Sequence, residues 1–424
     1  MLGDAKPGHL PNDRLGEQPG LVGDHGARHD TRMPEVSRQT GQANGVAAFR
    51  KQFPIFEQKV YLSSCSQGAL STPVEASLQE FIESWHTHGN PWETWVRRME
   101  ELRAEFAALI NASADEVAVT FSVSTALNSL ASALDYRERS GVVTSDFDFP
   151  TVGHVWLAQQ RRGARVSFAK ADGNRLPLNS FEEIVDQQTA LVSTTHVCYK
   201  NGFKNNVSAL AELAHERGAY LLIDAYQSMG TQPMDVKALD LDFLVTGALK
   251  YLLGSPGVAF MYVRRELIER LEPADSGWFG QENVFAYDVH HLRYAAQARR
   301  FETGSPPVPN VYAALAALRL IAGVGLATIE EHVRELMSRF IAGARQRGLH
   351  LITPEEPADR GPLAMVKSAD APKLVAVLAK DGILCSTRDG ALRVSLHYYN
   401  TAEDVDAVLA GLDRHPELLV TTAD

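Results

Sequence analysis

The sequence of 424 residues has few cysteines, no long apolar run and no excess of positive charge. Its three cysteines, Cys65, Cys198 and Cys385, lie far apart and form no C-x-x-C pair, so neither a disulfide framework nor a metal site is indicated. No run of about 18 apolar residues is present, which excludes a membrane-spanning helix. Acidic residues outnumber basic ones by 52 to 41, for a formal net charge of −11. Proteins that bind nucleic acids need positively charged surfaces to contact the phosphates, so the negative net charge argues against a nucleic-acid partner. The same net charge favours a cytoplasmic protein.

The chain divides into three regions by composition and pattern. Residues 1–45 are rich in Gly, Pro, Asp, Arg and His and have almost no apolar periodicity, so we predict a disordered N-terminal extension. Residues 46–300 alternate short apolar runs with helical stretches, which predicts an α/β domain whose mainly parallel sheet carries helices on both faces. Helices and strands over 301–424 predict a smaller α+β domain that includes the linking helix.

The predicted strands of the sheet are 141–144, 165–168, 190–194, 219–223, 241–246 and 257–263. The last of these follows its neighbour too closely for a helical crossover. We therefore expect it to run antiparallel to the strand before it.

Two polar residues follow consecutive apolar runs in the middle of the chain. Asp224 comes directly after one run, and Lys250 follows the next, close to Gly247 and Gly254. In open α/β sheets, ligands bind at the carboxyl ends of the strands, and glycines let the backbone approach closely. Taken singly, the aspartate is better explained as a helix N-cap and the lysine as a solvated side chain. Their coincidence on consecutive strands favours a functional site.

A carboxylate and a lysine amine brought together match the needs of pyridoxal phosphate. The pyridinium nitrogen of that cofactor needs a carboxylate to stay protonated, and its aldehyde needs an amine. The sequence therefore predicts pyridoxal 5′-phosphate as the cofactor.

Several motifs resemble, in order and spacing, the class V, fold-type I pyridoxal-phosphate enzymes, from about Tyr61 to Asp406. The run DAYQS, some twenty residues before TGALKYLLGSPG, is similar to the active site of this family, which includes cysteine desulfurases, kynureninases, isopenicillin N epimerase-like proteins and aminotransferases. The resemblance implies that Asp224 pairs with the pyridine nitrogen, that Gln227 contacts the phenolic oxygen and that Lys250 forms the internal aldimine.

Two further motifs imply cofactor contacts. The segment FSVSTALN follows a strand and opens a helix, where backbone N–H groups hold phosphates well, although an ordinary helix cap explains it equally. By resemblance, Val123 and Ser124 are the best phosphate contacts. The segment DFPT resembles the kynureninase segment whose aromatic ring stacks on the cofactor, which assigns that role to Phe149.

Two motifs further along the chain imply contacts with the cofactor or a partner subunit. The segment SGWFG resembles the G-W-W-G of kynureninases, so Trp278 is expected to face the cofactor or substrate; a buried core indole is the alternative. The segment RFETGS, which ends at Ser305, is similar to the R-F-E-x-G-T element that reaches the phosphate of the neighbouring subunit. A homodimer with shared active sites is implied.

Three residues are candidates for substrate binding. The segment LRVSLHYYNT resembles the closing motif whose arginine clamps the substrate carboxylate, which points to Arg393, because a guanidinium fork binds two oxygens at once. Gln67 lies in the segment that replaces the family's N-terminal carboxylate-binding turn. His196 ends a strand within an H-V-x-x-x-x-G element, although a hydrogen-bonded core histidine explains it equally.

Departures from the relatives narrow the function. The histidines that desulfurases carry at the stacking position are absent, and Cys385 ends an apolar run, so we interpret it as a small buried residue. Kynureninases normally carry a histidine where this chain has Gln227 and a tyrosine where it has Leu249. We predict an enzyme that acts at Cα or Cβ of an α-amino acid through an external aldimine, with kynureninase-like lyase chemistry favoured. Transamination and epimerisation are the alternatives, and a pyridoxal-phosphate-binding scaffold without turnover is the non-enzyme alternative.

Overall fold

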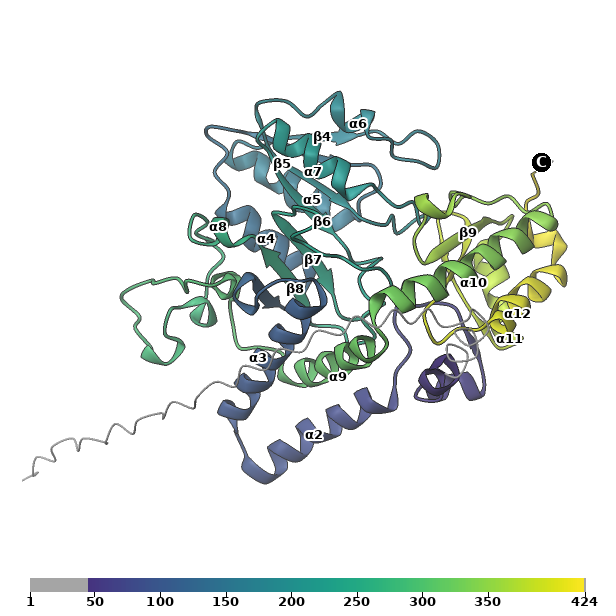
Figure 1. Cartoon of the computed structure of the whole chain (residues 1–424), viewed down its shortest axis with the longest axis horizontal. Coiled ribbons are helices and arrows are strands. Elements are labelled where there is room, and N and C mark those ends of the chain that lie inside the picture. Colours follow the sequence, from purple (N-terminus) through teal and green to yellow (C-terminus); the bar gives the residue numbers. More distant parts are fainter. Residues whose placement is uncertain (1–44, 423–424) are drawn as a thin grey trace, which may run out of the picture. The chain divides into compact units, whose positions relative to one another are not determined.

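The computed structural model describes residues 45–422 of the chain. The main element of the larger, N-terminal part of this range is a mixed sheet of seven strands. The strand order is β2-β8-β7-β6-β5-β3-β4, of which β8, β7, β6, β5 and β4 are labelled in Figure 1. The strands are β2 (Val117–Thr120), β3 (Gly141–Ser145), β4 (Arg165–Ala169), β5 (Thr189–Thr195), β6 (Tyr220–Asp224), β7 (Phe243–Gly247) and β8 (Ala259–Val263).

The direction of each strand follows from its connection. Strands β4, β3, β5, β6 and β7 are parallel to one another, whereas β8 is antiparallel to both β7 and β2. Parallel neighbours need a crossover long enough for a helix, and the short link between β7 and β8 cannot supply one. The predicted antiparallel direction of the last strand is therefore confirmed.

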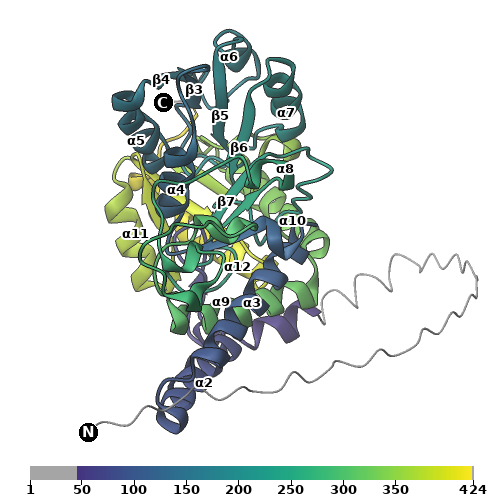
Figure 2. The same cartoon turned by 90° about the vertical axis from the view of Figure 1, so that its left-hand side faces the viewer.

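Helices cover both faces of this sheet. Along β6, Leu221 and Ile223 belong to one apolar cluster and Leu222 to another, as the alternation of a strand requires. Figure 2 shows α5 and α7 on opposite sides of strands β3, β5 and β6. The helices that precede or cover the sheet are α2 (Thr72–His88), α3 (Trp92–Leu109), α4 (Val123–Ala133), α5 (Pro150–Ala158), α6 (Asn179–Glu182), α7 (Val207–Glu216), α8 (Arg265–Ile268) and α9 (Val308–Val324).

A second, smaller sheet lies in the C-terminal part. Its order is β11-β12-β9, and both pairs are antiparallel. The elements are α10 (Leu326–Gln346), β9 (Leu363–Lys367), α11 (Ala371–Lys380), β10 (Ile383–Leu384), β11 (Ser386–Arg388), β12 (Ala391–Ser395) and α12 (Ala402–Asp413). The predicted fold class is thereby confirmed: a mainly parallel α/β sheet followed by a small α+β part.

The first described residues pack against this C-terminal part. The two-residue strand β1 (Val60–Tyr61) pairs in parallel with β10, and the rings of Phe53 and Tyr399 lie 4.9 Å apart. Consequently the segment that follows β1 lies beside β12, which matters for the site below. The domain boundaries at residues 46 and 301 stay predictions, and the expected disordered extension, 1–45, lies outside the described residues except for its last residue.

Within residues 45–422, no single helix is long and apolar enough to cross a membrane. Helices α9 and α10 pass that test only as a pair, and they meet at a bend of 79°. Both contribute buried side chains to the core.

Candidate active site

A pocket of about 310 Å³ opens at the carboxyl ends of β5 and β6 and at the start of α4. Thr195 and Asp224 end these two strands and are register partners, so their side chains arrive at the same edge of the sheet. The residues that line the pocket are Ser66, Ser122, Val123, Ser124, Phe149, Thr151, Val152, Thr195, Tyr199, Asp224, Tyr226, Gln227, Leu249 and Lys250.

Asp224 and Lys250 share this pocket, as the sequence predicted from their strands. Asp224 is buried, and its Oδ1 accepts a hydrogen bond from the backbone N–H of Tyr226 at 2.9 Å. Burial raises the pKa of Asp224, while this hydrogen bond and the charge of Lys250 act in the opposite direction. Burial lowers the pKa of Lys250 to about 8, against the attraction of Asp224. The pocket thus holds an amine that is partly neutral near neutral pH.

Aromatic rings surround the lysine amine. The Nζ of Lys250 lies 4.3 Å from the ring centroid of Tyr226 and 5.8 Å from that of Phe149. The ring of Tyr226 requires a glycine at 247, where a Cβ would lie 2.3 Å from the ring atoms. Ring faces attract an ammonium group, so these two rings help to hold the protonated form of Lys250 in the pocket.

The start of α4 supplies an anion-binding end to the pocket. Ser122 caps this helix by accepting a hydrogen bond from the N–H of Thr125 at 3.1 Å. The hydroxyl of Ser124 donates to Thr151 at 3.4 Å, and both line the pocket with Val123. Free N–H groups and the helix dipole make such an end suitable for a phosphate.

Gln227 and Phe149 complete the wall. The Nε2 of Gln227 donates to the backbone oxygen of Cys65 at 3.1 Å. Its Oε1 is buried and has no hydrogen-bond partner among residues 45–422, which is costly unless a ligand satisfies it. The ring of Phe149 is 42% exposed and meets the ring of Tyr199 edge-on at 5.0 Å. An exposed face of this kind is available for stacking on a planar ligand.

Asp148 anchors the turn that presents Phe149. Its Oδ2 accepts hydrogen bonds from Thr144 Oγ1 at 2.7 Å and from Ser145 N and Oγ at 2.7 and 2.9 Å. Burial raises the pKa of Asp148 to about 7, although these hydrogen bonds oppose the shift. These hydrogen bonds hold the turn between β3 and Phe149 in place.

Arg393 reaches the pocket rim from β12. It is 3% exposed and donates to Ser386 Oγ at 3.1 Å, to Tyr199 O at 3.0 Å and to Ser66 Oγ at 2.8 Å. No carboxylate among the described residues pairs with it. Gln67 is exposed and outside the lining; its Nε2 donates to Gly254 O at 3.4 Å. Its neighbour Ser66 takes the position that faces the cavity.

The structure places His196 away from this pocket. Because Thr195 faces the pocket and successive strand residues point to opposite faces, His196 projects to the other side of the sheet. Its Nδ1 forms a hydrogen bond with Ser228 Oγ at 2.9 Å, and burial lowers its pKa to about 3. This environment is that of a hydrogen-bonded core histidine, the alternative that the sequence left open.

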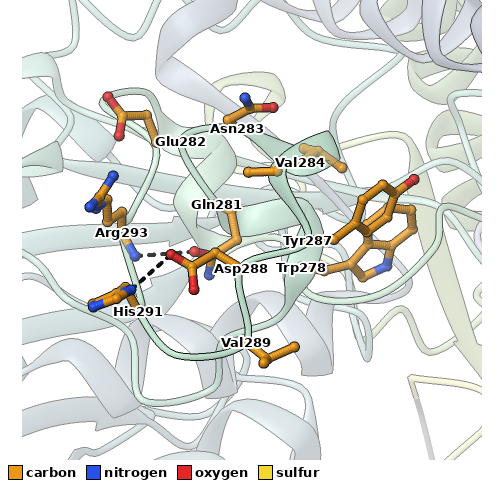
Figure 3. Close-up of a pocket in the computed structure, with 11 residues that line it drawn as sticks. Trp278, Gln281, Glu282, Asn283, Val284, Tyr287, Asp288, Val289, His291 and Arg293 are labelled. Carbon is orange, nitrogen blue, oxygen red and sulfur yellow. Dashed lines mark hydrogen bonds and ion pairs between the residues drawn. The ribbon is translucent and has the colours of Figure 1, made fainter. Parts of the chain in front are cut away.

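Trp278 and Ser305 also lie outside the Lys250 pocket in this chain. Trp278 stacks with Tyr287 at 6.3 Å and lines a separate cavity of about 500 Å³ (Figure 3). In the same loop, Nδ1 of His291 lies within hydrogen-bond distance, 2.9 Å, of Oδ2 of Asp288. Ser305 is exposed, with no hydrogen bond to another described residue. The expectation that Ser305 contacts the cofactor thus depends on a second subunit.

Taken together, the pocket supplies what pyridoxal phosphate requires: a buried carboxylate, a lysine amine of lowered pKa, an anion-binding helix end and an unpartnered buried amide oxygen. Within residues 45–422 no cluster of metal-binding side chains is present. The sequence analysis did not assign roles to Thr195, Tyr226 or Thr151. Of these, only Thr195 had a signal, the strand end beside Asp224.

Comparison with known proteins gives a consistent result. The profile of the aminotransferase class-V family matches residues 60–408. The chain is 39% identical over 357 residues to the uncharacterized aminotransferase YcbU of Bacillus subtilis, covering 84% of this chain and 94% of that protein. It is 30% identical over 369 residues to a kynureninase of Pseudomonas fluorescens, covering 82% and 86%.

Among solved structures, the fold resembles an apo cysteine desulfurase from Thermococcus onnurineus. The TM-score is 0.79 at 23% identity, covering 87% of this chain and 97% of the other. From the family match and the 39% identical relative, we conclude that the chain belongs to the aminotransferase class-V family of pyridoxal-phosphate enzymes.

Proposed function

We propose that this protein is an aminotransferase that acts on an α-amino acid, with Lys250 as the catalytic base. The observation that carries the proposal is the composition of one pocket. Lys250 is the only amine that lines it, and no imidazole from residues 45–422 does so. Transamination needs one group that removes a proton and returns it, and an amine with a pKa of about 8 does both near neutral pH.

The roles of the other residues follow from their positions. When bound, pyridoxal phosphate supplies an electron-poor ring that withdraws electrons from Cα. Asp224 holds a negative charge at the floor of the pocket, and Val123 and Ser124 offer N–H and hydroxyl donors at the start of α4. Gln227 offers an amide, and Phe149 covers one side. Lys250 Nζ moves the proton of substrate Cα.

Arg393 binds the α-carboxylate of the substrate in this proposal. It is buried and has no carboxylate partner among the described residues, and a guanidinium group suits a carboxylate through two parallel hydrogen bonds. Its contacts with Ser66 and Tyr199 hold it at the pocket rim. Gln67, next to Ser66, remains a candidate for the outer part of the substrate entrance.

Cleavage at Cβ is the second candidate. The SGWFG motif and the kynureninase relative at 30% identity favour it. Cβ cleavage was favoured partly because Trp278 was expected to face the cofactor or substrate. Within one subunit Trp278 lines a separate cavity, so that contact would need a partner subunit. For this reason we place transamination first.

We further infer a homodimer that uses the loop beside Trp278. Four apolar side chains of this loop are largely exposed: Phe285 by 58%, Tyr287 by 71%, Val289 by 87% and Leu292 by 54%. Several exposed apolar side chains within one short loop are typical of an interaction surface. In such a dimer, a second copy of the chain covers these side chains. Ser305 is exposed in this chain, as expected for a residue that contacts the cofactor of the neighbouring subunit.

The experiment is to purify the protein with pyridoxal phosphate and record its visible absorbance. We expect the band of the lysine-bound cofactor to be present in the natural sequence, absent in Lys250→Ala and retained in Lys170→Ala, a lysine that is 76% exposed on the side chain. The holoprotein is then incubated with a panel of amino acids. Build-up of pyridoxamine phosphate with a keto acid supports transamination, whereas release of alanine from a larger amino acid supports Cβ cleavage. A band that survives Lys250→Ala contradicts the proposal.

A further inference from the structure

The hairpin of β11 and β12 presents two arginines on one face. Arg393 lies opposite Ser386 in the register, and Arg388 is two residues further along β11. Because alternate residues of a strand share a face, the two arginines are diagonal neighbours, with a backbone separation of roughly 7–8 Å. The hydrogen bond from Arg393 Nε to Ser386 Oγ at 3.1 Å shows that the side chains of both strands share this face.

This face is directed toward the Lys250 pocket. Arg393 donates to Ser66 and to the backbone of Tyr199, which both line the pocket. The guanidinium carbon of Arg388 lies 5.6 Å from the ring centroid of Tyr199. Burial is the main cause of the lowered pKa of Lys250, and the positive charges of Arg393 and Arg388 add to it. Both arginines are therefore close enough to act on the amine.

Arg388 has no anionic partner of its own in the part of the chain that the structure describes. Among residues 45–422 no carboxylate pairs with it, and its Nε is buried without a hydrogen-bond partner. The adjacent Asp389 pairs instead with Lys200 at 3.6 Å. Leaving a half-buried guanidinium group unpaired is unfavourable, so this position is prepared for an acidic ligand.

We propose that Arg388 determines substrate specificity by binding a second acidic group, so that the substrate is an α-amino acid with an acidic side chain. This inference rests on the proposed function, in which Arg393 binds the α-carboxylate. With Arg393 occupied in that way, Arg388 is the neighbouring guanidinium on the same face, and its planar fork fits a side-chain carboxylate. Tyr199 contacts both groups, its ring facing Arg388 and its backbone oxygen accepting a hydrogen bond from Arg393.

The test compares matched pairs of amino acids that differ only in charge. The holoprotein is titrated with glutamate and glutamine, and with aspartate and asparagine, while the cofactor absorbance reports binding. We expect the acidic member of at least one pair to bind about tenfold more tightly, which corresponds to about 1.4 kcal/mol. Arg388→Gln is expected to abolish this preference. Arg388→Lys is expected to keep part of it, because the charge remains but the fork is lost.

Lys200→Gln is the matched control. Lys200 lies 5.9 Å from the same Tyr199 ring but is already paired, so its loss is expected to leave the preference in place. An equal loss in Lys200→Gln and Arg388→Gln would show a general effect of charge and would overturn the inference. So would a natural protein that responds to amino acids without preferring acidic ones; in that case the proposed function still stands. A protein that responds to no amino acid overturns both.

Discussion

Arg103 and Glu302 stand 199 residues apart in the sequence and form a buried ion pair, with each residue 3% exposed. Glu302 Oε1 also accepts the backbone N–H of Val119 at 2.9 Å. Arg300, in the same motif, donates to the backbone oxygens of Ala295, Ile268 and Leu271. The first part of the RFETGS motif thus ties the segment before Ser305 to the sheet.

We predict that Glu302→Ala lowers the free energy of unfolding by about 3–5 kcal/mol, because it leaves Arg103 buried without this counter-charge. Urea denaturation followed by circular dichroism measures the change. Glu100, which also pairs with Arg103 but has a side chain 52% exposed, provides the control. Glu100→Ala is expected to cost less than about 1 kcal/mol. If both variants lose the same free energy of unfolding, burial of the Arg103–Glu302 pair is not the reason for its effect on stability.

The rate at which the cofactor-free protein binds pyridoxal phosphate covalently should rise with pH around a midpoint of about 8. Only the neutral amine attacks an aldehyde, and burial lowers the pKa of Lys250 from 10.5 to about 8, so the neutral form predominates above that pH. Stopped-flow absorbance across a pH series measures the midpoint. A midpoint near the ordinary lysine value would show that the amine is solvated.

Asp224→Asn should move this midpoint to lower pH. The charge of Asp224 stabilises the ammonium form of Lys250 and so raises its pKa; without that charge, desolvation acts with less opposition. Asp146→Asn, which changes a surface carboxylate paired with Lys170, is expected to leave the midpoint in place. An upward shift in Asp224→Asn would contradict the proximity of the two groups.

Ser124→Ala should weaken the affinity for pyridoxal phosphate by about tenfold or more, because a hydrogen bond to a charged group contributes about 1.5–3 kcal/mol. Equilibrium dialysis of the cofactor measures this affinity. Ser132 lies at the opposite end of α4 and donates to Ser129 O at 2.7 Å. Ser132→Ala is expected to bind the cofactor normally. If both variants bind equally well, the phosphate does not contact Ser124.

The double variant Tyr287→Ser, Val289→Ser should shift the protein from dimer to monomer in sedimentation experiments. It removes two of the most exposed apolar side chains of the loop on which we base the interface. Leu157, which is 39% exposed on α5, serves as the control position. A monomeric natural protein, or a double variant of unchanged mass, would exclude this loop as the interface.

Local pattern predicted the large sheet well. Runs of buried apolar residues marked strands such as β3, β6 and β7, because a strand covered on both faces has few polar positions to obscure it. The ends of those strands placed Asp224 and Lys250 together. His196 shows the limit of the method: it directly follows Thr195, the last residue of β5, yet alternation directs it to the opposite face.

Strands β10 and β11 were not predicted, since each has at most three residues and no apolar alternation. Their pairing decides the rim of the pocket. Arg388 faces Tyr199 only because β11 and β12 adopt one register, and a shift by one residue would turn the side chain to the other face.

The amino-acid sequence alone predicted the type of fold, the cofactor and a pair of residues, Asp224 and Lys250, that the structure brings into one pocket, because short-range patterns and motif spacing carry that information. Which side chains line the cavity was decided by the tertiary structure. Ser66 and Tyr199 line it, and Arg393 at its rim donates hydrogen bonds to both, although the three residues come from distant segments of the sequence. Contacts of that kind depend on register and packing, which no local pattern encodes.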